Sequence, residues 1–170
     1  MGVVEFFKWL YEQAEMYIFP FTIINTYERG VRLTFGKNPQ LVMPGFRFKL
    51  PFFQAIFTEI ITPDTLQAKC VHVTTTDGKT VSVSPCIEYT KEDVIKWIVD
   101  NNESHTNLHD ILRAIVADYC TDLTWDECKK KTTCTAIKNR LNKRIESMGA
   151  TVHQVMFTDI SQSRIIITSI

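Results

Sequence analysis

The sequence predicts an α+β fold in which an antiparallel β-sheet half is followed by a helical layer and a returning C-terminal strand. Two changes in the pattern of apolar residues support this prediction. Between residues 22 and 89, short apolar runs alternate with turn residues, whereas from residue 91 onward apolar residues recur with the period of an α-helix. A last extended run, residues 150–159, returns to strand character. Strands first, helices next and one closing strand are typical of the α+β class.

The first 21 residues are expected to form a separate amphipathic helix that contacts a membrane or a partner. Apolar side chains at helical spacing fill about 160° of its circumference, and three glutamates outnumber the single Lys8 on the polar side. The helix should end before Pro20, because the residue ahead of a proline avoids the helical region. The candidate membrane-contact residues of this segment are Phe6, Phe7, Leu10, Tyr11, Tyr17, Ile18, Phe19 and Phe21.

Two alternatives stay open for this segment. Helices that seek a membrane surface usually carry basic residues on the polar face, so packing against its own domain or a neighbouring protein fits the glutamates equally well. No run of 18 apolar residues occurs in the chain. We therefore expect a peripheral or re-entrant membrane contact and no spanning helix.

Residues 22–89 contain six predicted strands, each bounded by turn residues. The strands cover residues 22–27, 31–35, 46–50, 56–62, 66–74 and 80–89. The Asp77-Gly78 pair between the last two is the strongest hairpin signal in the chain, because these residues tolerate the positive φ angles of a tight hairpin turn. The last two strands should therefore pair antiparallel.

Three helices are expected after residue 91. The first is short, residues 91–99, and Thr124 with Glu127 forms a capping box that opens the third, which runs to about residue 147 and stops at Gly149. After the closing strand, residues 164–168 are a further candidate strand. The second helix carries an apolar stripe of Leu108, Ile111, Leu112, Ile115, Val116 and Tyr119.

The run of residues 51–57 is unusually apolar. In a half-buried antiparallel strand every second residue should be polar. The excess implies either burial on both faces or an exposed apolar loop that contacts lipid or a partner, and the sequence leaves both open. The candidate membrane-contact residues in this run are Phe52, Phe53, Ile56 and Phe57.

Charge is segregated along a chain whose formal net charge is zero. Residues 88–127 hold ten acidic and three basic side chains, whereas residues 128–144 hold seven basic and no acidic ones. Two different patches that meet head to tail between copies would propagate a ring or filament, although two ordinary solvated helix faces fit the same pattern. The candidate oligomer-interface residues are Asp110, Asp118, Asp122, Lys130, Lys131, Lys138, Arg140 and Arg144.

The sequence offers little for catalysis, metal binding or nucleic-acid binding. His105 and His109 are spaced to share a metal on one helix face, but spacing places no further ligand. The five cysteines form no CxxC pair, which argues against a zinc site or a disulfide framework and for a reducing, cytosolic-side compartment. Nucleophile-elbow and phosphate-cradling glycine motifs are missing, and the basic residues lack stacking aromatics. We expect no enzyme activity, no cofactor or metal, and no nucleic-acid partner.

Several segments in order resemble the stomatin/prohibitin/flotillin (SPFH, band 7) family. They are similar to its opening strand pair, its proline-glycine turn with the following strand, its Thr-x-Asp-Gly hairpin, its helical layer and its final strand. The segments are residues 27–37 (YERGVRLTFGK), 43–52 (MPGFRFKLPF), 73–83 (VTTTDGKTVSV), 105–147, and 148–160 (MGATVHQVMFTDI). The resemblance covers about residues 22–160, so we expect an SPFH-like domain at residues 22–170 after the segment 1–21.

The resemblance implies a non-catalytic, membrane-associated scaffold whose copies pack side by side into rings, cages or arrays. Such assemblies organise lipid, or enclose and regulate membrane proteases and channels. The implied partners are a second copy, a lipid surface, and a membrane protease or channel. This chain lacks the long heptad-rich helix that follows the domain in the family, so large cages are not implied. The rival interpretation is a soluble structural or virion assembly component that uses the fold for protein–protein contacts only.

Overall fold

The computed structural model describes residues 2, 4–5, 8, 20–101 and 103–163. Most of the predicted N-terminal helix, and all of the predicted strand at residues 164–168, lie outside these residues. The elements are β1 (Phe21–Ile24), β2 (Glu28–Thr34), β3 (Lys37–Val42), β4 (Gly45–Phe48), β5 (Gln54–Ile60), β6 (Asp64–Gln67), β7 (Val71–Thr74), β8 (Thr80–Lys91), η1 (Lys96–Asp100), α2 (Ser104–Thr121), α3 (Trp125–Cys128), α4 (Lys131–Ile145), η2 (Glu146–Met148) and β9 (Ala150–Ser163).

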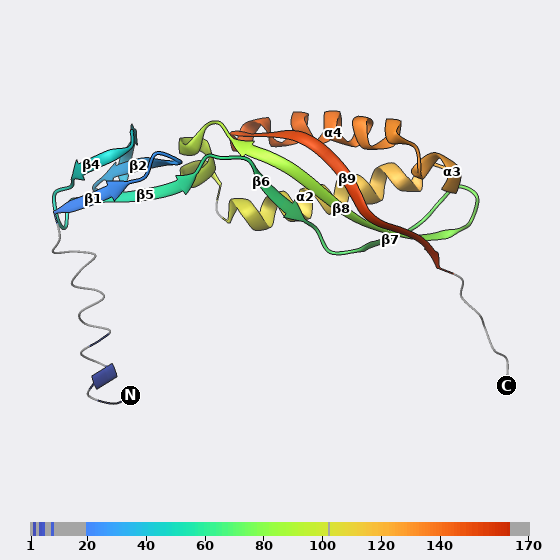
Figure 1. Ribbon diagram of the computed structural model, residues 1–170, viewed down its shortest axis with the longest axis horizontal. Coiled ribbons are helices and arrows are strands. Elements are labelled where there is room, and N and C mark those ends of the chain that lie inside the picture. Colours follow the sequence, from blue (N-terminus) through green and yellow to red (C-terminus); the bar gives the residue numbers. More distant parts are fainter. Residues whose placement is uncertain (1, 3, 6–7, 9–19, 102, 164–170) are drawn as a thin grey trace.

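The molecule is elongated and has two halves (Figure 1). The small-sheet half, residues 20–62, contains β1–β5, and the helical half, residues 63–163, contains β6–β9 with all the described helices. In the small-sheet half, β1 pairs with β4, and β2 lies between β3 and β5. In the helical half, β8 pairs with β9 along its whole length, while β6 and β7 pair with its other edge. The α+β fold class is thus confirmed.

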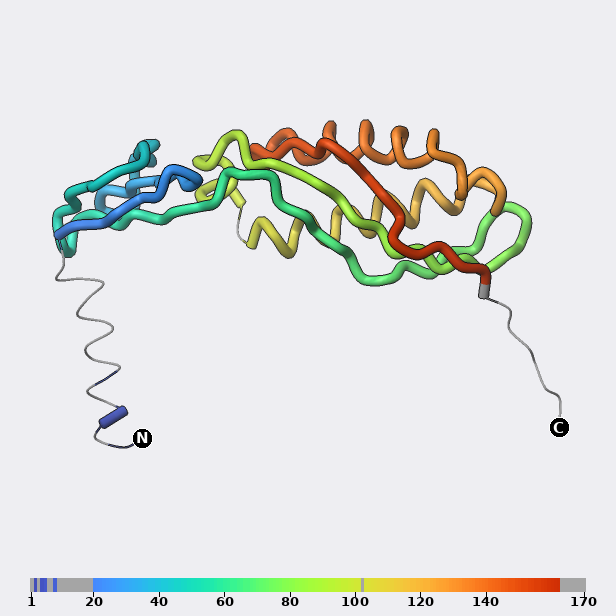
Figure 2. The backbone as a smooth tube through the Cα atoms, in the orientation of Figure 1, coloured from blue at the N-terminus to red at the C-terminus, as the bar shows by residue number. Residues whose placement is uncertain are grey.

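The long strands β8 and β9 twist together across the helical half, as the smooth trace in Figure 2 shows. The register of β9 shifts twice, between Ser84 and Pro85 and again between Glu88 and Tyr89 of β8. Such bulges increase the local twist of a pair of strands. The first of them also accommodates Pro85, which has no N–H to donate to a ladder. There Thr158 donates its hydroxyl proton to the Ser84 carbonyl, at 3.0 Å.

The core lies almost entirely in the helical half, between the β6–β9 sheet and the helices. The predicted stripe on α2 faces it: Leu108, Leu112 and Val116 are fully buried, and the other members are partly buried against the same cluster. Ile137, Leu141 and Ile145 of α4 repeat this spacing. The buried apolar residues of the small-sheet half are Ile24, Val31 and Val42.

Several predicted boundaries were wrong. The single strand expected at residues 66–74 is divided into β6 and β7, because the Ala68 N–H bonds to Pro85 and the Lys69 N–H bonds to His109 Nε2. The third helix is divided into α3 and α4, because Lys130 is extended and the Thr133 hydroxyl bonds to the Glu127 carbonyl.

Two further differences concern strand β3 and the helix predicted at residues 91–99. Strand β3 was missed because Pro39 suggested a turn, yet β3 is an edge strand, where proline is tolerated. The predicted helix at residues 91–99 begins only after β8 has ended at Lys91, and it finishes as the short π-helix η1. The hairpin between β7 and β8 was confirmed.

Within the described residues, the helices are too short or too polar to cross a bilayer.

Candidate functional site

The two-stranded ribbon of β1 and β4 presents an apolar face to solvent. The pairing places Phe21 opposite Phe48 and Ile23 opposite Phe46, so that all four side chains share one face. Ile23 is 70% exposed and Phe46 is 64% exposed. The Phe21 ring lies 4.9 Å from the Phe46 ring and 5.7 Å from the Phe48 ring, in contact distance for aromatic pairs. Half-buried strands normally turn this kind of face inward.

The opposite face of the ribbon is the one that packs on the rest of the small-sheet half. Ile24 is buried there and lies against Gly30 of β2, where an added Cβ would come within 2.7 Å of Ile24 Cδ1. Gly30 therefore permits the close approach of the two sheets. Because Ile24 already occupies the inner face, the Phe21, Ile23, Phe46 and Phe48 side chains have no core to enter.

A second exposed aromatic group lies on two neighbouring turns. Phe35 and Phe52 are 72% and 78% exposed, and both have positive φ angles, 53° and 66°. A bulky residue in this region is strained by about 1–3 kcal/mol, which a glycine would avoid. Phe53 contacts Phe35 at a ring distance of 5.2 Å, and the Phe35 N–H bonds to the Phe53 carbonyl.

These turns enclose an apolar groove of about 390 Å³. It is lined mainly by Phe35, Phe52, Phe53, Ile56 and Phe57, with Lys49 at its border. Of the alternatives for residues 51–57, the exposed one is correct for the phenylalanines, since Phe52, Phe53 and Phe57 are exposed and Ile56 is half-buried.

The ribbon and the turns meet at one end of the molecule, which we call the outer end. The pairs Phe21–Phe48 and Thr34–Gln54 put the start of β1, the end of β4, the start of β5 and the β2–β3 turn together. The Lys49 N–H bonds to the Pro20 carbonyl at 2.7 Å, which ties the groove border to the residue before β1. In Figure 1, β1 begins and β4 ends at the left edge, far from the helices. Residues 1–19 are therefore joined to the chain at the outer end.

A model of the SPFH domain / Band 7 family matches residues 22–170, most of the chain. The chain belongs to this family. No curated relative matches the sequence. Members of the SPFH family are generally membrane-associated scaffolds without enzymatic activity.

The described candidates for membrane contact are Phe21, Phe52, Phe53, Ile56 and Phe57, and their contact with a membrane stays a prediction. Phe21, Phe52 and Phe53 lie at the outer end of this SPFH domain, whereas Ile56 and Phe57 lie further along β5, and Phe57 also lines a cleft beside η1. The remaining candidates of the first segment lie outside the described residues: Phe6, Phe7, Leu10, Tyr11, Tyr17, Ile18 and Phe19. The sequence reasoning missed Ile23, Phe35, Phe46 and Phe48. In the sequence, Phe46 and Phe48 alternate with Arg47 and Lys49, which places the two phenylalanines on one face of the strand. The sequence could not show that this face points toward solvent.

The charged residues predicted at an oligomer interface lie on the helical layer of the SPFH domain. Two of them already pair within the chain: Arg140 Nη1 lies 3.3 Å from Asp118 Oδ2, and its guanidinium lies 4.6 Å from the Tyr119 ring. Asp110 and Arg144 border one cleft at the end of α2 and α4. Lys131 and Lys138 border a smaller groove between α4 and β9. Asp122 and Lys130 are exposed.

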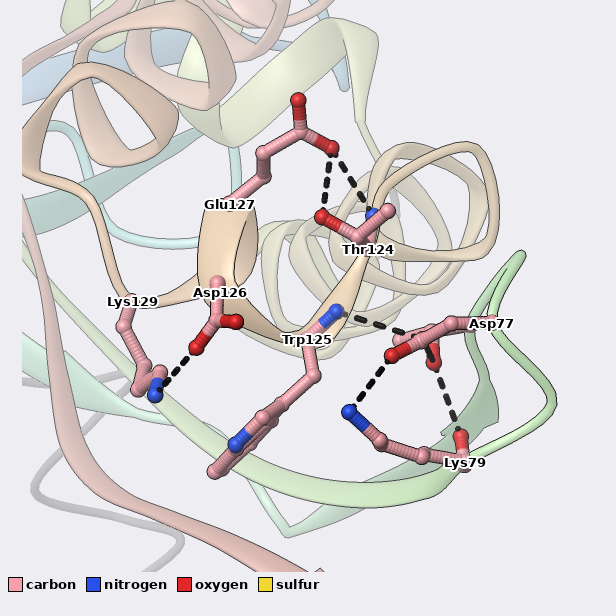
Figure 3. Close-up of polar contacts among 8 residues, drawn as sticks. Asp77, Lys79, Thr124, Trp125, Asp126, Glu127 and Lys129 are labelled. Carbon is pink, nitrogen blue, oxygen red and sulfur yellow. Dashed lines mark hydrogen bonds and ion pairs between the residues drawn. The ribbon is translucent and has the colours of Figure 1, made fainter.

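The β7–β8 hairpin is fixed to α3 by a polar network (Figure 3). Asp77 accepts hydrogen bonds from the Thr75 hydroxyl and from the Trp125 N–H, and it lies 2.8 Å from Lys79 Nζ. Lys79 and then Thr75 stabilise the ionised carboxylate and lower the pKa of Asp77 to about 2. The predicted capping box is present, since the Thr124 N–H and hydroxyl both donate to Glu127 Oε2. This network is structural and lies at the opposite end from the aromatic groups.

The two histidines considered for a metal have other partners. His105 Nδ1 lies 3.2 Å from the Tyr89 hydroxyl, and His109 Nε2 accepts the Lys69 N–H. Among the residues that the structure describes, no three histidine, cysteine or carboxylate side chains are grouped to hold a metal.

Proposed function

We propose that this SPFH-domain protein is a membrane-associated scaffold that contacts a bilayer with its outer end and self-associates through its helical half. It acts by position, corralling lipid or membrane proteins, without a chemical step. The observation that supports this best is the outward apolar face of the β1–β4 ribbon, next to two exposed aromatic turns. A large, contiguous exposed apolar surface marks an interaction site.

Burial of the exposed rings would supply free energy for a membrane contact at this end. Full burial of one large apolar side chain contributes about 1.5–3 kcal/mol. Phe35, Phe46 and Phe52 are each mostly exposed, so partial burial of these three rings would contribute a few kcal/mol toward membrane binding, in addition to any contribution from residues 1–19. The positive φ angles of Phe35 and Phe52 place both rings on exposed turns, where they could enter the interface.

Membrane contact through residues 1–19 rests on their sequence and on their attachment at the outer end. An apolar helix face and the aromatic turns would then enter the same leaflet together. The competing occupant of the outer end is protein, either this first segment folded back or a neighbouring molecule, as the soluble assembly role requires.

Vesicle flotation tests the membrane role with a matched pair of variants. Phe52→Ser with Phe53→Ser should lower the partition coefficient at least about tenfold, because two rings leave the interface. The control is Val99→Ser with Met156→Ser, which removes two exposed apolar side chains from the helical half. The control should float like the parent. A parent chain that stays at the bottom of the gradient would exclude this function and favour a soluble assembly component.

Self-association is expected to use the exposed charges of the basic stretch at residues 128–144. Lys130→Glu with Lys131→Glu reverses two charges of this basic stretch. The control Lys69→Glu reverses the charge of an exposed lysine away from α4. Electron microscopy of the protein on vesicles should show ordered arrays for the parent and for Lys69→Glu, and isolated particles for the double variant. Arrays that survive the double reversal would remove these residues from the interface.

A further inference from the structure

The small-sheet half has an uneven distribution of charge. Its acidic residues sit together at the end next to the helical half, whereas several basic ones lie at or near the outer end. The bases of residues 20–62 are Arg29, Arg32, Lys37, Arg47 and Lys49, and the acids are Glu28 and Glu59. A basic, aromatic end is what an anionic lipid surface would bind.

The strand register places both carboxylates away from the aromatic turns. Glu28 lies opposite Ile60, at the end of the β2–β5 pair that joins the helical half, and Glu59 lies opposite Arg29. Both carboxylates are already engaged: Glu59 Oε2 lies 2.7 Å from Lys91 Nζ, and Glu28 Oε2 accepts the Asn25 N–H. Neither carboxylate therefore lies beside Phe35, Phe52 or Phe53, although Glu59 lies close to Phe57 on β5.

Two lysines stand beside the exposed rings. Lys37 is exposed, follows Phe35 and Gly36 in the β2–β3 turn, and pairs across it with Thr34. Lys49 borders the apolar groove together with Phe35 and Phe52. Arg47 lies on the strand position between two outward phenylalanines, and its guanidinium donates to the Met43 and Pro44 carbonyls. Lys37 and Lys49 are the two lysines of the small-sheet half, and both lie beside the exposed rings of the turns.

We propose that the outer end is selective for bilayers that contain anionic lipid, with Lys37 and Lys49 at the headgroup phosphates and carboxylates while the neighbouring rings enter the interface. This rests on the proposed membrane function and adds the class of lipid. A lysine near an anionic membrane surface contributes about fivefold in binding, and salt screens this contribution within about a Debye length. The first 21 residues carry three glutamates and one lysine, which oppose the preference, so the two lysines have to outweigh them.

The experiment compares the full chain on neutral phosphatidylcholine vesicles and on vesicles in which part of the lipid is phosphatidylserine. The parent should bind the anionic vesicles at least about fivefold more tightly, and high salt should remove the difference. Lys37→Gln with Lys49→Gln should abolish the preference while leaving binding to neutral vesicles unchanged. The matched control is Lys69→Gln with Lys143→Gln, two exposed lysines of the helical half, which should keep the preference.

The outcomes separate this proposal from the membrane role itself. Equal binding of the parent to both kinds of vesicle, or a preference that survives in Lys37→Gln with Lys49→Gln, overturns the lipid selectivity and leaves the membrane role standing. Failure of the parent to bind either vesicle overturns both. Circular dichroism of each variant checks that the fold is retained, and the single variant Lys37→Gln, at an exposed lysine, checks the preference without the half-buried Lys49.

Discussion

Lys91 Nζ lies 2.7 Å from Glu59 Oε2, and this ion pair joins the last strand of the small-sheet half to the end of β8. The Lys91 side chain is only 4% exposed and lies over the Trp97 ring at 5.4 Å. Tyr89, two residues earlier on β8, reaches Asp64 and His105 at the same junction. The orientation of the aromatic outer end relative to the helical layer depends on these contacts.

Removing the acidic partner of this pair should destabilise the protein. Glu59→Gln leaves the buried Lys91 charge without a counter-ion, which costs about 2 kcal/mol after allowance for the partial exposure of Glu59. Lys96→Gln, which breaks an exposed pair with Asp93, should cost less than about 1 kcal/mol. Urea unfolding of the two variants gives both values. Equal, small losses would mean that the junction does not depend on the pair.

Gly149 is expected to be the glycine least tolerant of substitution. It has a φ of 74°, and an added Cβ would lie 2.4 Å from the Asp93 carbonyl oxygen. Its own carbonyl accepts the Glu92 and Asp93 N–H groups, so the contact cannot relax easily. Gly149→Ala should cost at least about 3 kcal/mol, whereas Gly78→Ala, with a similar φ and open space, should cost about 1 kcal/mol. Thermal or urea unfolding distinguishes the two, and similar costs would contradict the packing described here.

Acid should weaken the network that fixes the β7–β8 hairpin to α3. The pKa of Asp77 is lowered from 3.8 to about 2, so the folded state gains stability from the ionised carboxylate above pH 3.8 and loses it as the pH falls toward 2. Asp77→Asn keeps acceptors for Thr75 and Trp125 but removes this pH dependence. Its unfolding midpoint should therefore change less than that of the parent over this interval, while the exposed Asp122→Asn behaves like the parent. Parallel curves for parent and Asp77→Asn would refute the role of the charge.

The cysteines should differ sharply in reactivity. Burial raises the pKa of Cys120 to about 12, and Cys128 is buried beside it, whereas Cys70 is exposed. In the native protein, a thiol reagent followed by mass spectrometry should label Cys70 first, and Cys120 and Cys128 only after unfolding. Rapid labelling of Cys120 under native conditions would show that α2 does not pack as described.

The fold could be predicted where its signals are local. The Asp77-Gly78 hairpin, the Thr124–Glu127 capping box and the α2 stripe each depend on residues a few positions apart, and the structure confirms all of them. Strand β3 was missed because Pro39 suggested a turn. Proline is also tolerated in an edge strand, and β3 is one.

The candidate site was harder to predict because it depends on contacts between distant segments. Alternation puts Phe46 and Phe48 on one face of a strand, but which face is buried is decided by Ile24 of β1 packing on Gly30. Likewise, nothing near Phe35 indicates that its turn lies beside Phe53, since β2 and β5 pair although two strands, β3 and β4, separate them in the sequence. Composition alone identified the apolar run at residues 51–57.

Hydrogen exchange of the unmodified protein, measured by mass spectrometry with and without vesicles, tests the membrane contact most directly. Lipid should slow exchange in peptides that contain the turns at residues 34–38 and 49–54, because the exposed rings there enter the interface and exclude water. Peptides from strands β6–β8 of the helical half, away from the outer end, should exchange at the same rate in both samples. Unchanged exchange at both turns, on vesicles that carry the bound protein, would contradict the central role given to the outer end.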